Sequence, residues 1–486
     1  MNNGENARNQ KFIMMTTKPV EGLICRLAVP TIISMLVTTF YNMADTYFVG
    51  KIGFNETESV KAAMQTQATA AVGVVAALMA IIQALGFFFG HGSGNYISRG
   101  LGNRDTENTA KIASAGFYYA IIAGVLLAVL GNVFGRPLAF LLGATEGTVD
   151  YTLDYMRIIL LGAPINMASL VLNNQIRFQG NAAFAMFGIS FGAMLNIGLD
   201  ALFILVFDME VIGAALATVI GQAVSLVLLI IGVYKSDCVK VSLKNLRFDR
   251  FSFAEIAKGG LPSLGRQGIA SISAACLNNM AATYGAAYYG NAAAGDSAIA
   301  SMSIVSRIML FAASTLIGFG QGFQPVCGFN YGAGLNLRVK KAFWFCVKSA
   351  LIFLVMVAVP VFIFSENIIA VFRPNDPIAL KIGTDALRWQ TVTFPVMSWV
   401  VISNMMLQTM GKTVSATILA VARQGLAFIP MILILPPALG LLGVETAQPA
   451  ADIIAIIISI PVTLKVLREL SIDRNPENSL PAGNKQ

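Results

Sequence analysis

The chain has 486 residues, of which 56% are hydrophobic and only 12% are charged, and its mean hydropathy is +0.70. Soluble domains carry about 25% charged residues, so this composition excludes a soluble globular protein and predicts a polytopic membrane protein. The formal net charge of +8 comes from short segments between apolar runs, a pattern typical of inner membrane loops and not of nucleic-acid binding. The five cysteines are odd in number and widely spaced, so they indicate neither a disulfide framework nor a zinc site.

Twelve apolar segments are long enough to cross a bilayer as helices, since a span needs about 20 mostly apolar residues. They are residues 24–49, 66–97, 108–134, 148–178, 182–206, 210–234, 256–284, 296–328, 337–364, 377–409, 413–437 and 443–468. Two shorter pieces, 136–143 and 366–372, are expected to lie at the membrane interface. Residues 1–18 are polar and lack the features of a cleavable signal, so the first helix is expected to direct insertion itself.

The basic residues predict the orientation of the chain. If the N-terminus is cytoplasmic, the inside segments hold 22 of the 33 Lys and Arg residues and the outside segments hold five. Basic residues are concentrated in cytoplasmic loops, so this asymmetry predicts that both termini are cytoplasmic. We expect a multi-pass monomer in a bilayer of the bacterial inner-membrane type, with no nucleic-acid partner.

An internal repeat relates the two halves of the sequence. Pro30 and Pro262 open the first and seventh helices at an offset of 232 residues, and several glycine pairs keep that offset, such as Gly86 with Gly318 and Gly90 with Gly322. Six is an even number of spans, so both halves enter the membrane from the same side. The sequence therefore predicts an all-α fold with twelve transmembrane helices in two six-helix bundles, related by a pseudo-two-fold axis along the membrane normal.

This duplication sets the predicted domain organisation. Residues 1–23 form a cytoplasmic N-terminal segment, 24–234 an N-lobe, 235–254 a basic cytoplasmic linker, 255–468 a C-lobe and 469–486 a cytoplasmic tail. Duplicated bundles of this kind bind substrates and coupling ions near the interface between the repeats. The architecture therefore favours a transporter over a receptor or a membrane-embedded enzyme.

Two aspartates break the repeat. Asp45 corresponds to Leu277 and Asp200 to Met431, so both carboxylates belong to the N-terminal half alone. A carboxylate inside a membrane costs about 2.5 to 3.5 kcal/mol, and such residues usually face a bundle interior or a wet cavity on an ion or substrate path. The alternative for Asp45 is a position in the outer interface, where it caps a helix.

Both acids lie at a similar depth. Asp45 is about 21 residues into its helix and Asp200 about 18 residues into its own, which is roughly 31 Å and 27 Å at 1.5 Å per residue. Two carboxylates in one poorly solvated pocket should not both be ionised, so one proton or one bound cation is expected there. Asn196 shares a helix face with Asp200 because it lies four residues earlier. Thr218 on helix six is a further candidate, although such hydroxyls more often hold helices together.

The C-terminal half places positive charge at depth. Four arginines fall about eleven residues into their helices, near the middle of the bilayer, namely Arg266, Arg307, Arg388 and Arg423. The acids available to them are Asp385 and Asp452. Intramembrane arginines normally form ion pairs or face water. They therefore either lock helices together or line a cavity that receives anionic parts of a substrate.

At these residues the chain resembles the multidrug and toxic compound extrusion (MATE) transporters. The resemblance covers about residues 26–470 and is most specific in YNMADTYFVG, NNQIRFQG, LNIGLDALFI, GAALATVIGQ and GFGQGFQPVCGFNYGAG. It implies two bundles arranged as a V around a central cavity. It also implies export of organic cations or other amphipathic toxicants in exchange for H+ or Na+.

The resemblance also implies roles for particular residues. Asp45, Asn196, Asp200 and Thr218 match positions implicated in cation coupling in the N-lobe, and Pro30 matches the proline where helix one bends. Some branches of the family also place acidic sodium-site residues in helices seven and ten. This sequence has none at those places but instead has Arg266, Gln267, Trp389 and Gln390. Coupling is therefore expected in the N-lobe alone.

Antiport of cations is the favoured function, and a flippase for a lipid-linked or anionic precursor is the alternative. The four arginines suggest the alternative because they could receive a pyrophosphate group. A membrane-bound enzyme is not expected, since no catalytic constellation is visible. We expect no organic cofactor, and no metal site other than Na+ at Asp45 and Asp200.

Overall fold

The computed structural model describes residues 2–52, 58–235, 239–374 and 376–474, and all regular structure in these residues is helical. Twelve long helical segments lie in this part of the chain. They are α2 (Val20–Val49), α3 (Glu58–Gly102), α4 (Thr106–Val133), α6 (Val149–Phe178), α7 with η1 (Ala182–Asp200 and Ala201–Val206), α8 (Glu210–Lys235), α9 (Arg250–Tyr289), α10 (Ala292–Gly332), α11 (Asn336–Ile363), α13 with η3 and α14 (Pro377–Thr393, Phe394–Val396 and Met397–Thr409), α15 with η4 and α16 (Thr413–Val421, Ala422–Phe428 and Ile429–Leu439), and α17 (Leu441–Glu469). Each predicted span corresponds to one of these segments.

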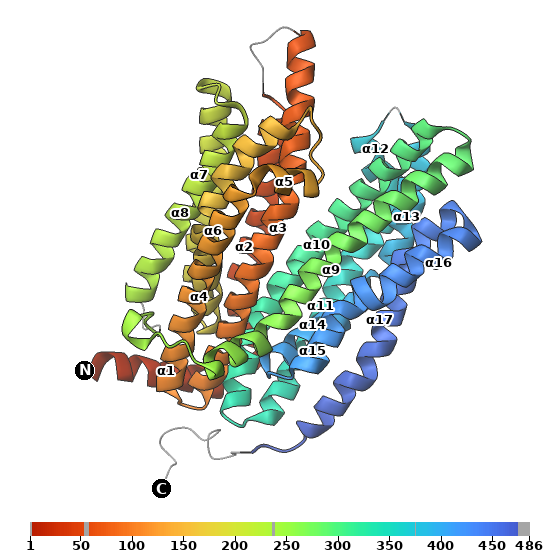
Figure 1. The fold of residues 1–486 in the computed structure, drawn as a ribbon. Coiled ribbons are helices and arrows are strands. Elements are labelled where there is room, and N and C mark those ends of the chain that lie inside the picture. The colour runs from red at the N-terminus through yellow and green to blue at the C-terminus, as the bar shows by residue number, and fades with distance from the viewer. Residues whose placement is uncertain (1, 53–57, 236–238, 375, 475–486) are drawn as a thin grey trace.

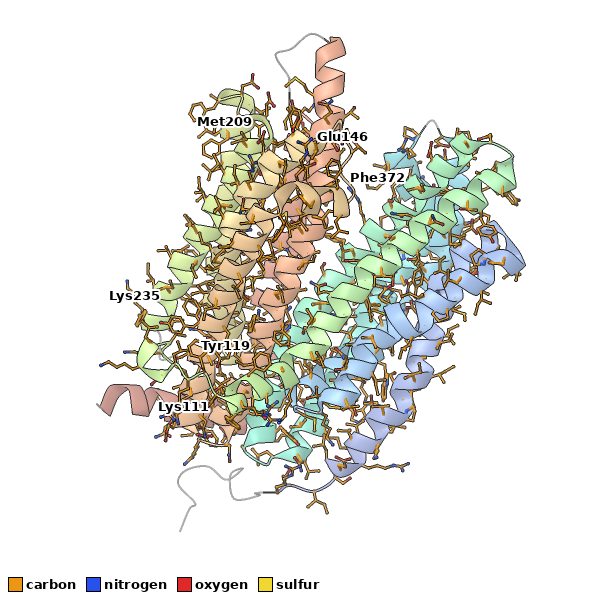
Figure 2. The ribbon with its side chains drawn as sticks, in the orientation of Figure 1. Lys111, Tyr119, Glu146, Met209, Lys235 and Phe372 are labelled. Carbon is orange, nitrogen blue, oxygen red and sulfur yellow. The ribbon has the colours of Figure 1, made fainter. Side chains whose placement is uncertain are left out.

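The helices form two bundles arranged as a V (Figure 1). We call α2 to α8 the N bundle and α9 to α17 the C bundle. The bundles meet at the end where α1 lies and α17 ends, which we call the terminal side, and diverge toward the opposite, distal side. In Figure 2, Lys111 and Lys235 lie toward the terminal side, while Glu146, Met209 and Phe372 lie at the distal side. The all-α prediction of two six-helix bundles is therefore confirmed.

Ten helices in the described ranges are long and apolar enough to cross a membrane. The other two long segments, α9 and the α13 to α14 segment, are not both long and apolar enough, and the cause differs between them. α9 carries polar residues along its length, and the α13 to α14 segment is interrupted by the short turn η3, which contains Pro395. Proline removes a backbone donor from the helix ladder, so a local change of helix type at Pro395 is expected.

Two short helices lie where separate short elements were predicted, and the polar ends need two corrections. The short helices α5 (Gly135–Leu141) and α12 (Ser365–Phe372) lie where 136–143 and 366–372 were expected. The N-terminal segment contains a helix, α1 (Asn2–Thr17), that the sequence did not predict because only a few of its residues are apolar. The linker does not extend to Ala254, since α9 already begins at Arg250, where Asp249 Oδ1 accepts from Ser252 N at 2.8 Å. Residues 236–238 of the linker and 475–486 of the tail lie outside the described residues.

Close glycine contacts join the two bundles. α2 packs on α10, and α3 packs on α9. A Cβ atom added at Gly322 would lie 2.5 Å from Ala28 Cα, and one at Gly260 would lie 2.8 Å from the carbonyl carbon of Phe88. Only glycine allows backbones this near, as at other helix interfaces in membranes. Gly260 follows Ala28 by 232 residues, which is the offset of the internal repeat. The α2–α10 and α3–α9 interfaces are therefore equivalent in the duplicated fold.

Polar contacts close the same seam on the terminal side. The buried side chain of His91 on α3 places Nδ1 2.8 Å from Ser263 Oγ on α9. Arg99 on α3 donates to the carbonyl oxygen of Thr409 on α14 at 2.8 Å and lies 3.7 Å from the carboxylate of Glu255 on α9. The bundles are therefore held together on the terminal side by both packing and hydrogen bonds.

Candidate functional site

A cluster of polar side chains lies inside the N bundle near its distal side. It consists of Asp45 on α2, Tyr155 on α6, Asn196 and Asp200 on α7, and Thr218 on α8. We call these five residues the N-bundle polar cluster. They meet because α7 packs between α2 and α8, while α6 packs on α8. The fold thus brings together the four residues that the sequence singled out and adds a fifth.

The two carboxylates receive no hydrogen bond from any described residue where they are enclosed. Asp200 is fully buried, and neither Oδ1 nor Oδ2 has a partner within the described ranges. Asp45 is partly buried, and its enclosed Oδ1 also lacks a partner there. A buried carboxylate without a donor or counter-charge is costly. The enclosed carboxylate oxygens therefore carry an electrostatic cost that a bound proton or cation would remove.

The amide and hydroxyl of the cluster add further oxygen atoms. Asn196 Nδ2 donates to Thr218 Oγ1 at 3.4 Å, which points the amide oxygen away from that hydroxyl. Asn196 Oδ1 is buried and has no partner in the described part of the chain. Carboxylate, amide and hydroxyl oxygens are the ligands that hard cations prefer. This donor set suits a small hard cation as well as a proton.

Tyr155 is a cluster member that the sequence analysis missed. It is fully buried, and its phenol interacts electrostatically with Asp45, Asp200 and Tyr41. It lies six residues after the distal start of α6, a depth of about 9 Å at 1.5 Å per residue. The sequence analysis estimated the depth of Asp45 and Asp200 by counting residues along their helices. The same count along helix four would have identified Tyr155.

A cavity of about 90 Å³, lined in part by polar side chains, adjoins the cluster within the N bundle. Asn196, Thr218 and Tyr41 line it together with amide and hydroxyl side chains from neighbouring helices, including Gln83, Asn166, Ser169, Gln222 and Ser225. A cavity of this size with several polar partners can hold a few water molecules. The cluster therefore lies beside a space in which a cation can be hydrated or exchanged.

Two backbone features flank the cluster. The segment after Asp200, η1, is a π-helical turn, a feature that often occurs at functional sites. In α2 the helix continues through Pro30, and the hydroxyl of the next residue, Thr31, donates to the carbonyl oxygen of Gly318 on α10 at 2.6 Å. Pro30 therefore lies where α2 contacts the C bundle, and the polar cluster lies at the other end of the same helix.

The C-bundle charges are only partly paired. Arg423 Nε donates to Asp452 Oδ1 at 2.7 Å, so one of the two available acids pairs with an arginine. Arg388 Nε instead donates to Ser365 Oγ at 3.0 Å, and it forms no ion pair with Asp385 in the described residues. Arg266 and Arg307 likewise form no ion pair within the described ranges, and the side chain of Arg307 is exposed. Arg423 thus fits the locking interpretation, while the other three arginines remain open to a ligand.

The sequence analysis also overlooked a buried acid in the C bundle. Glu445 on α17 is 6% exposed and interacts electrostatically with Asp385 and Lys381. It lies in the first turns of a predicted span, so a count of charges along helix twelve was a signal that could have found it. No group of three or more His, Cys, Asp or Glu side chains suited to a metal ion occurs in the described residues.

Comparison with known proteins places this arrangement in a family. A family model described as MatE matches residues 30–202 and 271–434, which together are more than half of the chain. The multidrug export protein MepA of Staphylococcus saprophyticus is 27% identical over 448 residues, covering 92% of this chain and 94% of that protein. MepA of Staphylococcus aureus strain MRSA252 is 26% identical over 467 residues, covering 96% and 98% of the two chains.

Solved structures share the fold. A multidrug resistance MATE family transporter in an outward-facing conformation superimposes with a TM-score of 0.85 at 24% identity, covering 94% of this chain and 98% of that one. A MOP superfamily transporter from Pyrococcus furiosus gives a TM-score of 0.85 at 25% identity, covering 95% and 98%. The binding pocket of that transporter has a reversed polarity, which suggests a different function for it.

Proposed function

This chain belongs to the MATE family of membrane transporters, and we propose that it is a multidrug efflux antiporter that exports organic cations or amphipathic toxicants in exchange for H+ or Na+. The MepA relatives are multidrug export proteins, which supports the substrate class. We further propose that both termini lie in the cytoplasm, so that the distal side of the bundles faces outward.

The single observation that carries the proposal is the unsatisfied state of the N-bundle carboxylates. Asp200 offers two buried oxygens and Asp45 one, and none receives a hydrogen bond from the described residues. A proton or Na+ that enters from the distal side removes this electrostatic cost, with Asn196 and Thr218 as neutral partners. Loading of the site therefore relieves a cost that the unloaded carboxylates carry.

Exchange also requires that cation binding changes the affinity for substrate, since a ligand shifts an equilibrium only by its differential affinity for the two states. The helix α2 provides the connection. It carries Asp45 near its distal end, and earlier in its length Thr39 Oγ1 lies 3.3 Å from Ser314 Oγ on α10 while Phe40 packs edge-on against Phe311. A movement of α2 on cation binding therefore changes its contacts with the C bundle. Bending at Pro30 would give α2 that freedom.

The test uses purified protein in proteoliposomes loaded with a cationic dye. A pH gradient and a Na+ gradient are applied separately, and export is followed by dye fluorescence. At least one gradient should drive export by the wild-type protein. Asp45→Asn and Asp200→Asn should each reduce driven export at least tenfold, because a neutral amide no longer needs a cation.

Asp150→Asn is the matched control, since Asp150 is an exposed acid near the start of α6 on the same side. This control should export dye like the wild type. Full export by both cluster variants, or no export by the wild type with either gradient, would contradict the proposal.

The flippase alternative keeps one supporting observation. Arg266, Arg307 and Arg388 have no carboxylate partner among the described residues, so they could receive an anionic group. A lipid pyrophosphate added to the same liposomes separates the two functions. Under the flippase hypothesis Arg266→Gln should abolish precursor transfer, whereas under the antiport hypothesis the wild type should move the dye but not the precursor.

A further inference from the structure

A groove of about 700 Å³ opens between α2 and α11 near the terminal side. It is lined by Glu21 of α2 and by Lys341, Trp344, Phe345 and Lys348 of α11. It lies outside the N-bundle polar cluster. We propose that this groove binds the phosphate head group of an anionic phospholipid such as phosphatidylglycerol.

The four α11 residues form one face of the helix. Their spacing of three, four and seven residues places them on a common stripe. The intervening residues Phe343, Cys346 and Val347 are buried in the core of the C bundle. The groove therefore faces away from the bundle, toward the surrounding lipid.

The same face of α11 becomes wholly apolar beyond the groove. Ile352, Val355 and Met356, which follow Lys348 by four, seven and eight residues, are 60%, 41% and 61% exposed. An exposed apolar band of this kind is the surface that contacts acyl chains. Lys348 is therefore the last charged residue on α11 before this apolar band.

The charges of the groove favour an anion. Lys341 Nζ lies 2.9 Å from Glu21 Oε1, so this lysine already has a counter-charge. Lys348 forms no ion pair or hydrogen bond with any described residue, although it lies twelve residues into α11, a depth of about 18 Å. An ammonium at such a depth extends toward the nearer head-group layer. Two lysines and one glutamate leave a net charge of +1, which complements a phosphodiester.

The aromatic side chains suit the rest of a lipid. Trp344 is 38% exposed and packs on Trp399 with ring centroids 5.7 Å apart. Tryptophan is enriched where membrane meets water because its ring is apolar and its N–H is polar. Basic pockets between transmembrane helices bind anionic head groups in the same way. A soluble anion would use the lysines but gain nothing from this aromatic wall.

Trp344 provides a native reporter for the test. The chain has three tryptophans, and Trp389→Phe removes the other strongly exposed one. The Trp389→Phe variant is placed in phosphatidylcholine nanodiscs. These nanodiscs contain a small fraction of lipid that is brominated on its acyl chains near the head group. Brominated phosphatidylglycerol and brominated phosphatidylcholine are compared by the quenching of tryptophan fluorescence.

Phosphatidylglycerol should quench with an apparent affinity about fivefold above that of phosphatidylcholine, the effect expected for one lysine near the membrane surface. Lys348→Gln should remove this preference. Lys348→Arg should keep it, which separates loss of charge from a failure to fold. Lys240→Gln removes an exposed charge elsewhere on the terminal side and should leave the preference unchanged.

Three outcomes would overturn the proposal. The first is equal quenching by the two brominated lipids in the Trp389→Phe variant. The second is a preference for phosphatidylglycerol that persists when Lys348→Gln is added. Displacement of the lipid by millimolar inorganic phosphate would instead assign the groove to a soluble anion.

Discussion

His91 Nδ1 lies 2.8 Å from Ser263 Oγ, so one hydrogen bond joins α3 of the N bundle to α9 of the C bundle. Gln408 Nε2 on α14 donates to the same hydroxyl at 2.8 Å. Ser263 is thus the centre of a buried polar contact across the seam. Any state in which the bundles separate on the terminal side must break it.

Ser263→Ala should therefore favour separation of the bundles on the terminal side. One hydrogen bond contributes about 0.5 to 1.5 kcal/mol, so the open population should rise about two- to tenfold. Cys327 reports this opening because it is fully buried on α10 beside Arg99 at the seam. In a variant that retains only this cysteine, its labelling by a water-soluble maleimide should accelerate by the same factor.

The matched control for that experiment is Ser273→Ala. Ser273 also lies on α9, but its hydroxyl donates to the carbonyl oxygen of Gln424 within the C bundle at 2.7 Å. It should leave the labelling rate unchanged. Equal rates for the two variants would mean that the His91 to Ser263 contact does not hold the seam.

Gly322→Ala should weaken the contact between α2 and α10. The new methyl would lie 2.5 Å from Ala28 Cα, a distance that the backbone must relieve by moving. Overpacking of this kind should lower the free energy of unfolding by about 1 to 3 kcal/mol. Thermal unfolding in detergent, followed by size-exclusion chromatography, should show a lower midpoint. Gly73→Ala is the control, because a Cβ there meets no atom within 4 Å, and it should be neutral or slightly stabilising.

Arg423→Met should destabilise the C bundle by about 3 to 5 kcal/mol, because it leaves Asp452 buried without its counter-charge. Asp452 is only 3% exposed, and its other partners are the neutral side chains of Gln448 and Thr393. The double variant Arg423→Met with Asp452→Leu should recover most of the loss, since no unpaired charge remains. The midpoint of thermal unfolding measures both. A single variant as stable as the wild type would show that the ion pair contributes nothing.

Tyr155→Phe should weaken cation binding by about two- to tenfold, the effect of one polar partner for the bound cation, while leaving the fold intact. The phenol interacts with both Asp45 and Asp200, so its loss removes a polar neighbour that both carboxylates share. The readout is the cation concentration that gives half-maximal dye export from proteoliposomes. Tyr151→Phe, one turn away on α6, is the control, because that phenol interacts with Glu210 instead. An unchanged half-maximal concentration in Tyr155→Phe would exclude this residue from the site.

The twelve spans, the duplication and the common depth of Asp45 and Asp200 could all be predicted from the amino-acid sequence. Each of these depends on local composition, on chain offset or on a rise of 1.5 Å per residue, and none requires knowledge of neighbours. The π-helical turns after Asp200 and around Arg423 were not foreseen, since they reflect packing rather than composition.

Which side chains contact one another depends on the packing of the helices and could not be predicted. The tertiary structure placed Tyr155 beside the two aspartates, paired Arg423 with Asp452 and directed Arg388 to Ser365 instead of Asp385. It also brought Lys348 to the groove beside α2. Depth along a helix follows from counting residues, but contact depends on how each helix is rotated about its axis. One residue changes that direction by about 100°, and packing against helices distant in the sequence sets the rotation.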